Sequence, residues 1–225
     1  MVVETRLSPS RSTPGTVDSP AANLASEMIT SDQIFQWTLE GKCFTASIPV
    51  ESDPPDGGTD HSDTAQTYML NSDTAGTKLI IPLATTICPE VVSSGSETVL
   101  WVVAHIRSTN ATGTLRTVSG TSMTIINNRG DLYGTQTATA LYTVTSSALV
   151  AADWNEIAVF KTNQKSNQSA NTGIAQNTVV LNHFNEMAPL VLYKGGSLSA
   201  QCFASTAPRM RLTFQWAELD ASVYL

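Results

Sequence analysis

Apolar residues in this chain recur at every second position in short runs, and clusters of Gly, Asn, Asp, Ser and Pro separate these runs. This pattern is typical of β-strands joined by turns, because successive side chains of a strand point to opposite faces. The clearest run is 209–219, in which one face carries Met210, Leu212, Phe214 and Trp216. No long amphipathic helical pattern competes with these runs. We therefore expect an all-β protein.

The alternating runs predict about ten short strands. The earlier ones are expected at 42–48, 67–70, 77–83, 97–107, 122–126, 140–145, 155–161 and 178–183. The last two, 197–204 and 209–219, are separated by a Ser-Thr-Ala-Pro break, and we expect them to pair as a hairpin. Many short strands with turns imply an antiparallel β-sandwich or a jelly roll. Pro82 and Pro89 are expected at edge or bulge positions.

The first residues of the chain differ from the rest, because three prolines lie there among Ser, Thr and Gly. Such a segment cannot bury enough apolar surface to fold alone. We expect residues 1–36 to form an extended N-terminal arm and linker, with room for one helical turn within 26–37. Residues 37–225 are expected to form the sandwich domain. The candidate interaction residues of the arm are Arg6, Pro9, Arg11, Pro14 and Pro20.

Charged residues make up only 14% of the chain, against roughly 25% in an average soluble domain. Low charge suits extensive contact surfaces, whose centres are depleted of charged side chains. The formal net charge is −7, which is the wrong sign for attraction to phosphate backbones. Two arginines in the arm are too few to change this. Nucleic acid is therefore an unlikely partner.

The three cysteines are Cys43, Cys88 and Cys202, an odd number without CxxC spacing. Neither a zinc site nor a disulfide framework is indicated, and buried reduced thiols are expected. The chain shows no signal peptide and no apolar run of roughly 18 residues. We therefore expect no membrane association, and a protein that is made and kept in a cytoplasm until it is used.

Two polar segments, 51–63 and 162–177, are long enough to be binding loops or solvated tips. The first carries Asp53, Asp56, Asp60 and Asp63 beside His61. Carboxylates are the hard ligands that Ca²⁺ prefers, and they make this loop a weak metal candidate. Their spacing matches no calcium-binding loop, so a solvated turn is the better interpretation. We expect no metal ion and no cofactor.

Catalytic motifs are missing from the sequence. It contains no GxSxG, SxxK, GxGxxG or GxxxxGK[ST] pattern, and the two other histidines, His105 and His183, end strand-like runs where packing roles are common. We therefore expect no catalytic residues and no enzyme activity. A carbohydrate- or receptor-binding module remains an alternative if aromatic residues are exposed, although Trp101 and Trp216 are better explained as core.

Five short motifs stand out along the chain: Gly41-Lys42-Cys43-Phe44, Leu79-Ile80-Ile81-Pro82-Leu83, Pro189-Leu190-Val191-Leu192, Gly195-Gly196-Ser197-Leu198 and Phe214-Gln215-Trp216-Ala217-Glu218-Leu219. With these motifs the chain resembles β-sandwich virion proteins of bacteriophages, and the similarity covers roughly Lys42 to Leu219. The resemblance is to the capsid decoration or cement class, with single jelly-roll capsid proteins as a neighbouring possibility.

This resemblance implies a non-enzymatic structural protein of a virus capsid. Members of the cement class bind the outside of a phage head, commonly as trimers. The expected partners are therefore a major capsid protein or other copies of this chain in a homotrimer. The resemblance supplies no active-site residues. The acidic loop at 51–63 departs from the pattern.

Overall fold

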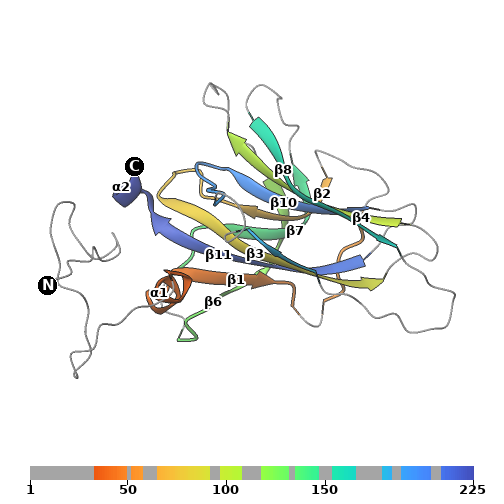
Figure 1. Ribbon diagram of the computed structural model, residues 1–225, viewed down its shortest axis with the longest axis horizontal. Coiled ribbons are helices and arrows are strands. Elements are labelled where there is room, and N and C mark those ends of the chain that lie inside the picture. Colours follow the sequence, from red (N-terminus) through yellow and green to blue (C-terminus); the bar gives the residue numbers. More distant parts are fainter. Residues whose placement is uncertain are drawn as a thin grey trace, which may run out of the picture.

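The computed structural model describes residues 33–49, 52–57, 65–91, 97–107, 118–131, 135–146, 154–165, 179–183, 189–203 and 209–225. In this part of the chain, eleven strands form two antiparallel sheets that pack face to face, with two short helices at one end (Figure 1). The prediction of an antiparallel all-β sandwich is confirmed. Among the same residues, no helix has the length and apolar character needed to cross a membrane.

The strands follow the sequence pattern closely. Every predicted strand overlaps an observed one. The bounds are β1 Cys43–Ser47, β2 Ala65–Asn71, β3 Lys78–Val91, β4 Glu97–Arg107, β5 Val118–Ser122, β6 Thr124–Asn127, β7 Thr139–Ser146, β8 Trp154–Lys165, β9 Val179–Asn182, β10 Ser197–Phe203 and β11 Arg209–Asp220. The helices are α1 Gln33–Leu39 and α2 Ala221–Tyr224. The first four residues of the predicted loop 162–177 belong to β8.

The two sheets have different sizes. The five-stranded sheet has the order β6-β1-β11-β3-β9, and the six-stranded sheet has the order β5-β7-β2-β10-β4-β8. If β5, β6 and β7 are set aside, the pairing is nested: β1 pairs with β11, β2 with β10, β3 with β9, and β4 with β8. The first strand therefore lies beside the last, and the second beside the second to last. The chain is a long antiparallel ribbon that has been folded across both sheets.

The predicted hairpin of 197–204 with 209–219 is wrong. Strand β10 lies between β2 and β4 in the six-stranded sheet, whereas β11 lies between β1 and β3 in the five-stranded sheet. Alternation reveals which residues of a strand face the core, but it does not reveal which strand lies alongside. The two strands face each other across the core because their apolar faces have to meet.

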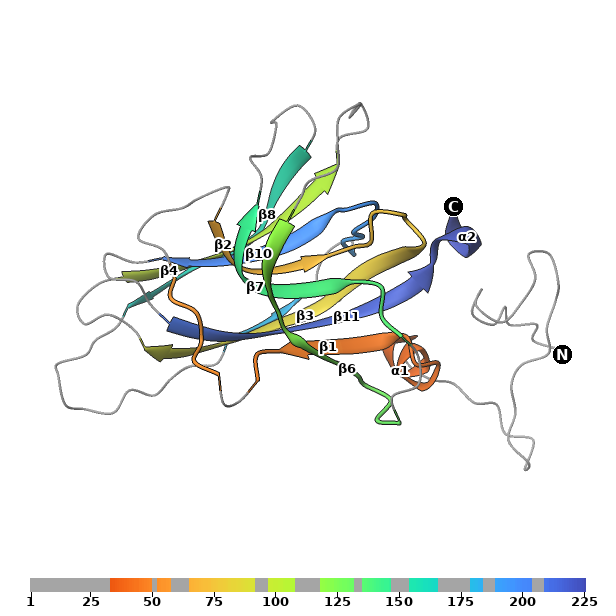
Figure 2. The same cartoon turned by 180° about the vertical axis from the view of Figure 1, so that it is seen from behind.

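The predicted strand 122–126 is also two elements. Strand β5 ends at Ser122 and β6 begins at Thr124, and the buried Met123 between them donates its N–H to the carbonyl of Ala140 over 2.8 Å. At Met123 the chain passes from the six-stranded sheet to the five-stranded sheet, as Figure 2 shows. This crossing joins the edges of both sheets on one side of the sandwich.

The main core lies between the sheets. The predicted apolar face of β11 is confirmed, because Met210, Leu212, Phe214 and Trp216 are all buried there. The ring of Trp216 stacks on Phe44 of β1 with centroids 5.9 Å apart. The buried Tyr68 hydroxyl of β2 donates a hydrogen bond to the carbonyl of Met210. This hydrogen bond connects the two sheets through the core and satisfies the polar end of the aromatic side chain.

Both predicted prolines lie in β3, which is an inner strand of its sheet. The pairing of β3 with β11 shifts register twice, once beside Pro82 and once beside Pro89. The ladder of β3 with β9 covers Ala84 to Ile87, between the two prolines. Proline lacks the N–H that a regular ladder needs, and bulges tolerate it. Both prolines lie beside a register shift and outside the part of β3 that pairs with β9, so the prediction of an edge or bulge position is confirmed.

Candidate functional site

The outer face of the five-stranded sheet carries a set of uncharged side chains that the strand register brings together. Phe44 and Ala46 of β1 point into the core, so Thr45 and Ser47 point outward. Cross-strand neighbours share a face, and the register then assigns the remaining outward residues. We name this surface the hydroxyl face; it consists of Thr45, Ser47, Ala84, Thr86, Thr124, Ile126, Val180, Thr213 and Gln215.

One row of the hydroxyl face crosses all five strands. Ser47 lies opposite both Thr124 and Thr213, Thr213 lies opposite Thr86, and Thr86 lies opposite Val180. Four of these five side chains carry a hydroxyl group, and Val180 on β9 exposes 62% of its surface. Because hydroxyls and methyls lose less hydration free energy on burial than charges do, this row suits contact with another protein surface.

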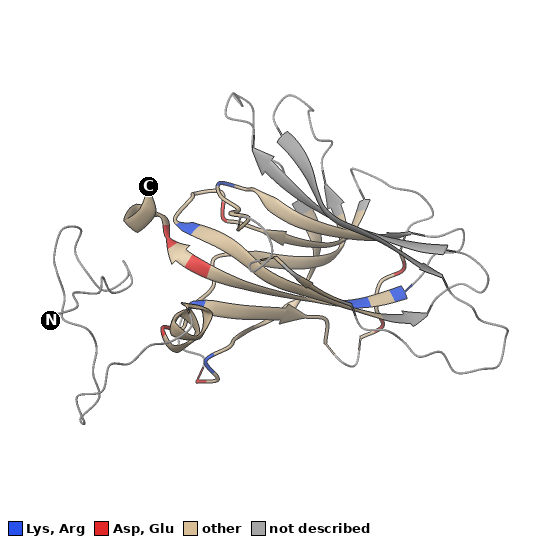
Figure 3. Ribbon diagram, in the orientation of Figure 1, with Lys and Arg blue, Asp and Glu red and all other residues tan. Residues whose placement is uncertain are grey.

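Charged side chains lie at the two ends of β11. In Figure 3 the middle of β1, β11 and β3 carries neither blue nor red, while the start of β11 is blue and its end is red. Arg209 and Arg211 alternate with the buried Met210 and Leu212 and therefore lie on the outer side, next to the hydroxyl face. Glu218, at the other end, is buried on the core side. The hydroxyl face itself is uncharged, as the centres of protein contact surfaces commonly are.

Helix α1 covers one end of this same sheet. Trp37, 2% exposed, packs with Leu79, Ile81, Ala217 and Leu219 in a second apolar cluster outside the main core. The helix ends at Leu39, and the turn after it contains Gly41, whose φ of 71° lies in the left-handed region that favours glycine. The N–H of Lys42 then donates to the carbonyl of Trp37 over 2.9 Å. This turn directs the chain from α1 straight into β1.

Cys43 lies beneath α1 and belongs to the same second cluster. Burial raises the pKa of its thiol above the ordinary value, because the charged thiolate loses hydration, while a hydrogen bond with Thr38 acts in the opposite direction. A thiol of this kind is unreactive. This agrees with the predicted packing role of a buried, reduced cysteine.

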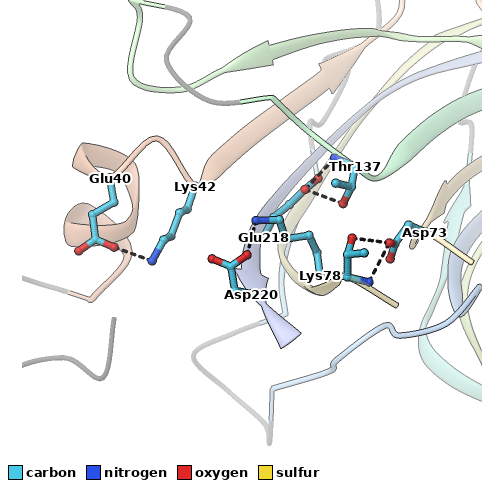
Figure 4. A network of polar contacts seen from close by, with 8 residues as sticks. Glu40, Lys42, Asp73, Lys78, Thr137, Glu218 and Asp220 are labelled. Atoms are coloured by element: carbon cyan, nitrogen blue, oxygen red, sulfur yellow. Dashed lines mark hydrogen bonds and ion pairs between the residues drawn. The ribbon is translucent and has the colours of Figure 1, made fainter. Parts of the chain in front are cut away.

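Glu218 is a buried carboxylate at the helical end of the sandwich (Figure 4). One oxygen, Oε2, accepts hydrogen bonds from the N–H and the hydroxyl of Thr137, both over 2.8 Å. The other, Oε1, accepts from the N–H of Ala138 over 3.0 Å and from the indole N–H of Trp216 over 2.9 Å. With four donors around it, this carboxylate fixes the segment before β7 onto β11. Its role is structural.

Two ion pairs lie near Glu218 in Figure 4. Lys78 Nζ lies 2.6 Å from Asp220 Oδ1, and Lys42 Nζ lies 2.7 Å from Glu40 Oε2. Each pair joins neighbouring elements: the first joins β3 to β11, and the second joins the end of α1 to the start of β1. Lys42 and Lys78 are thereby each paired with a carboxylate.

At the opposite end, two arginines of β11 hold the chain that follows β1. Arg211 donates from Nη1 to the carbonyl of Pro49 over 3.1 Å and from Nη2 to that of Ser52 over 3.0 Å. Arg209 Nε pairs with Asp56 Oδ1 over 2.6 Å. The sequence reasoning did not identify these arginines as anchors, because their partners lie more than 150 residues away along the chain.

The acidic loop is therefore only partly a solvated turn. Asp56 is bound by Arg209, and Asp53 is exposed, whereas Asp60, His61 and Asp63 lie outside the described residues. Within the described part of the chain, no group of three or more His, Cys, Asp or Glu side chains is placed to hold a metal ion. Asp53 and Asp56, the two aspartates of the loop that the structure describes, belong to no such group.

His183 follows β9 and is buried. Its Nε2 lies 2.9 Å from the hydroxyl of the buried Thr85, and its N–H donates to the carbonyl of Leu83 over 2.8 Å. Burial lowers the pKa of the imidazole below 6.5, because the charged form loses hydration. His183 thus packs β9 against β3, in agreement with the packing role predicted for it.

The alternative of a carbohydrate-binding module depends on exposed Trp and Tyr side chains, and those described within the strands and beside them are buried or half-buried. Trp37, Trp216 and Tyr68 are buried, and Tyr142 and Tyr193 are half-buried beside the two clusters. The side chains of Trp101, Tyr133 and Trp154 lie outside the described residues.

The predicted arm residues Arg6, Pro9, Arg11, Pro14 and Pro20 also lie outside the described residues. The structure begins at α1, which overlaps the end of the predicted helical stretch 26–37 and crosses the predicted domain boundary at 36/37. Because Trp37 and Ile34 both pack on the sheet, α1 belongs with the sandwich.

Glu218 is a buried structural residue that sequence reasoning missed, although a signal was present. Positions 210, 212, 214 and 216 are apolar and face inward, and continuing this alternation places a glutamate at the next inward position, 218. A carboxylate on an apolar face needs buried donors. The sequence alone could not say that Thr137, 81 residues away, supplies two of them.

These features define an all-β sandwich protein with a nested strand order, an uncharged outer sheet face and internally paired charges at both ends. Comparison with family models, curated proteins and solved structures found no match.

Proposed function

We propose that this protein is a non-enzymatic structural component of a virus particle. The nested pairing of β1 with β11, β2 with β10, β3 with β9 and β4 with β8 carries the proposal. Pairing of the first strand with the last, and so on inward, is the winding of an eight-stranded jelly roll, with β5 to β7 as an insertion. The jelly roll is an architecture of viral capsid domains, and lectins and cupins use it as well.

The chemistry of the surface supports a structural role over the other uses of a jelly roll. A cupin needs a cluster of metal ligands in the barrel, and a lectin needs exposed aromatic or polar groups that converge on a sugar. The hydroxyl face instead offers a broad uncharged area built from five strands. Such an area suits repeated contacts between subunits.

Two structural roles follow, and a different observation favours each. The nested strand order favours a single jelly-roll shell protein, which assembles with copies of itself. The net charge of −7 favours a decoration protein, because a shell protein that faces the genome gains from positive charge and a protein on the outside of the shell does not. The partners are copies of this chain in the first case and a major capsid protein in the second, where a homotrimer is the expected form.

The mass of the purified full-length protein in solution distinguishes these roles. Light scattering at low and high concentration, followed by electron microscopy, reveals closed particles for a shell protein and a discrete trimer for a decoration protein. A monomer at every concentration would argue against both roles and would favour a binding module.

A charged substitution tests whether the hydroxyl face is the surface through which subunits contact each other. Thr213→Lys places an ammonium group at the centre of the hydroxyl face, and burial of that charge in a contact is unfavourable. We expect at least a tenfold loss of assembly, which corresponds to about 1.4 kcal/mol. The matched control is Thr121→Lys on exposed β5 of the other sheet. Equal assembly of both variants would show that the hydroxyl face makes no subunit contact.

A further inference from the structure

The turn between β2 and β3 holds an aspartate in a fixed position, near the other polar residues of the helical end (Figure 4). Asp73 Oδ2 accepts hydrogen bonds from the N–H of Thr77 over 2.9 Å and from its hydroxyl over 2.6 Å. The backbone carbonyl of Asp73 accepts from the N–H of Gly195 over 3.1 Å. One carboxylate oxygen and the backbone of Asp73 are thereby tied down, and the position of the second oxygen follows.

Two side-chain oxygens of this region are buried and have no hydrogen-bond donor. One is Asp73 Oδ1, the second oxygen of the carboxylate. The other is Oδ1 of Asn71, a residue that is only 8% exposed. Buried polar atoms of native proteins are nearly always paired with protein groups, with water or with an ion, and an unpaired one lowers stability. Both oxygens therefore need a partner that donates a hydrogen bond or carries positive charge.

Asn71 and Asp73 lie on the same side of the chain. Leu70 of β2 belongs to the main core, so Asn71 points to the outer side of the six-stranded sheet. The pairing with the β10 side continues past the end of β2, because Ser72 donates its N–H to the carbonyl of Gly196 over 2.9 Å. In an extended chain, residues two positions apart share a side, with Cα atoms about 6–7 Å apart. One ion between the two side chains can therefore contact both oxygens.

The chemistry of the two oxygens favours a cation over a water molecule. A water molecule can donate to both oxygens, but it leaves the negative charge of Asp73 unbalanced, and no described Lys or Arg forms an ion pair with this carboxylate. Carboxylate and amide oxygens are ligands that Ca²⁺ prefers. Ca²⁺ also tolerates irregular coordination, whereas Mg²⁺ demands near-ideal octahedral geometry.

We propose that Asn71 and Asp73 bind a calcium ion through their Oδ1 atoms and that the ion stabilises the turn between β2 and β3. Among the described residues, Asp73 belongs to no group of three or more His, Cys, Asp or Glu side chains that could hold a metal ion, so water oxygens complete the coordination shell. With one carboxylate ligand, the dissociation constant is on the order of 0.1–1 mM, as in low-affinity calcium modules.

This site is independent of the virion role. It lies in a turn that sequence reasoning did not single out, whereas the weak metal candidate of the sequence was the acidic loop at 51–63. At a dissociation constant on the order of 0.1–1 mM, the site is loaded in millimolar calcium and loses its ion in micromolar calcium.

Thermal unfolding of the full-length protein, first freed of metal with a chelator, tests the proposal. We expect about 10 mM CaCl₂ to raise the midpoint temperature by about 3–10 °C, because calcium binds the folded state and not the unfolded chain. NaCl at the same ionic strength is the control for screening of the net charge of −7 and should not reproduce this rise. Calorimetric titration with CaCl₂ then gives the dissociation constant.

Two variants locate the ion. Asp73→Asn should abolish the response to calcium; its amide oxygen still accepts from Thr77 and its amide N–H can donate to Asn71, so the variant folds without calcium. Asn71→Ala should weaken calcium binding at least about tenfold, since it removes one of two protein ligands. The matched control is Asp53→Asn, which removes the same charge from an exposed position in the acidic loop and should keep the full response.

Three results would overturn the proposal. The first is a midpoint temperature that calcium does not raise, which would leave water as the partner of both oxygens. The second is an equal rise in NaCl of the same ionic strength, which would assign the effect to screening. The third is a calcium response that survives in Asp73→Asn or disappears in Asp53→Asn, because either outcome places the ion elsewhere.

Discussion

The buried carboxylate of Glu218 gives the sharpest test of how this sandwich is held together. The side chain is 3% exposed, and it accepts four hydrogen bonds, from the N–H and hydroxyl of Thr137, the N–H of Ala138 and the indole of Trp216. Replacement by alanine removes every acceptor at once. The hydroxyl group of Thr137 can rotate toward another acceptor, but the three N–H groups are fixed by the backbone and by the packing of the indole.

The expected loss of stability follows from these three fixed N–H donors. Each buried N–H left without an acceptor costs about 1–3 kcal/mol. Loss of the carboxylate also removes its own desolvation penalty, which offsets part of this cost. We therefore expect Glu218→Ala to lower the free energy of unfolding by about 3–5 kcal/mol, the range for breaking a buried charged interaction. The whole protein is stabilised by only about 5–15 kcal/mol, so the variant is severely weakened.

Glu218→Gln refines the same test. The amide oxygen can still accept from Ala138 and Trp216, but the amide nitrogen then meets the N–H of Thr137, and two donors face each other. We expect a loss of about 1–2 kcal/mol, between the native protein and the alanine variant.

Equilibrium unfolding in urea measures both variants. With a slope of about 2–3 kcal/mol per molar urea, the midpoint of Glu218→Ala falls by about 1–2 M. The control is Gln215→Ala, on the exposed side of the same strand, which should change the stability by less than about 0.5 kcal/mol. If Glu218→Ala shifts the midpoint no more than this control, the carboxylate does not hold the segment before β7, and the reasoning is refuted.

Three further predictions follow from other contacts. The folded state keeps His183 neutral just below pH 6.5, where the unfolded chain takes up a proton, so the stabilisation by His183 is present above pH 6.5 and is lost as the pH falls. The free energy of unfolding of the native protein minus that of His183→Gln, both from urea unfolding, should therefore be larger at pH 7.5 than at pH 5.5, and equal differences would contradict this. Arg211→Ala removes the hydrogen bonds to the carbonyls of Pro49 and Ser52. In limited proteolysis this variant should be cleaved within 49–57 several times faster than the native protein, and an unchanged rate would mean that the arginine does not anchor this segment. Trp37→Ala empties the centre of the second cluster and should cost about 3–5 kcal/mol, measured by thermal unfolding; a loss below 1 kcal/mol would show that α1 adds little to the sandwich.

Much of the fold could be read from side-chain alternation. The run 209–219 appears as β11 with the predicted inward residues, and 97–107 matches β4 at both ends. Side-chain alternation predicts these strands because one face of each strand is buried and the other is hydrated. Apolar and polar residues therefore alternate along the sequence of the strand. The positions of Pro82 and Pro89 at register shifts follow equally from local chemistry.

The candidate surfaces were less accessible to sequence reasoning. Each residue of the hydroxyl face is an ordinary Thr, Ser, Ala, Val, Ile or Gln, and no motif marks it. The face exists because Ser47, Thr86, Thr124, Val180 and Thr213 come into one row when five strands pair in this register. The ion pair of Arg209 with Asp56 was equally hidden from sequence reasoning, because 153 positions separate the two residues.

The sequence by itself determined the class of the fold, the approximate strands and the inward side of the clearest one, because these depend on local period and on the hydrophobic effect. Only the tertiary structure decided which strands are neighbours. Strands β10 and β11 are adjacent in the chain and were expected to pair, yet each lies in a different sheet. Both strands have an apolar face, and pairing them side by side would have been compatible with alternation. Their placement on opposite sides of the core is set by the simultaneous burial of all the strands, which no local segment encodes.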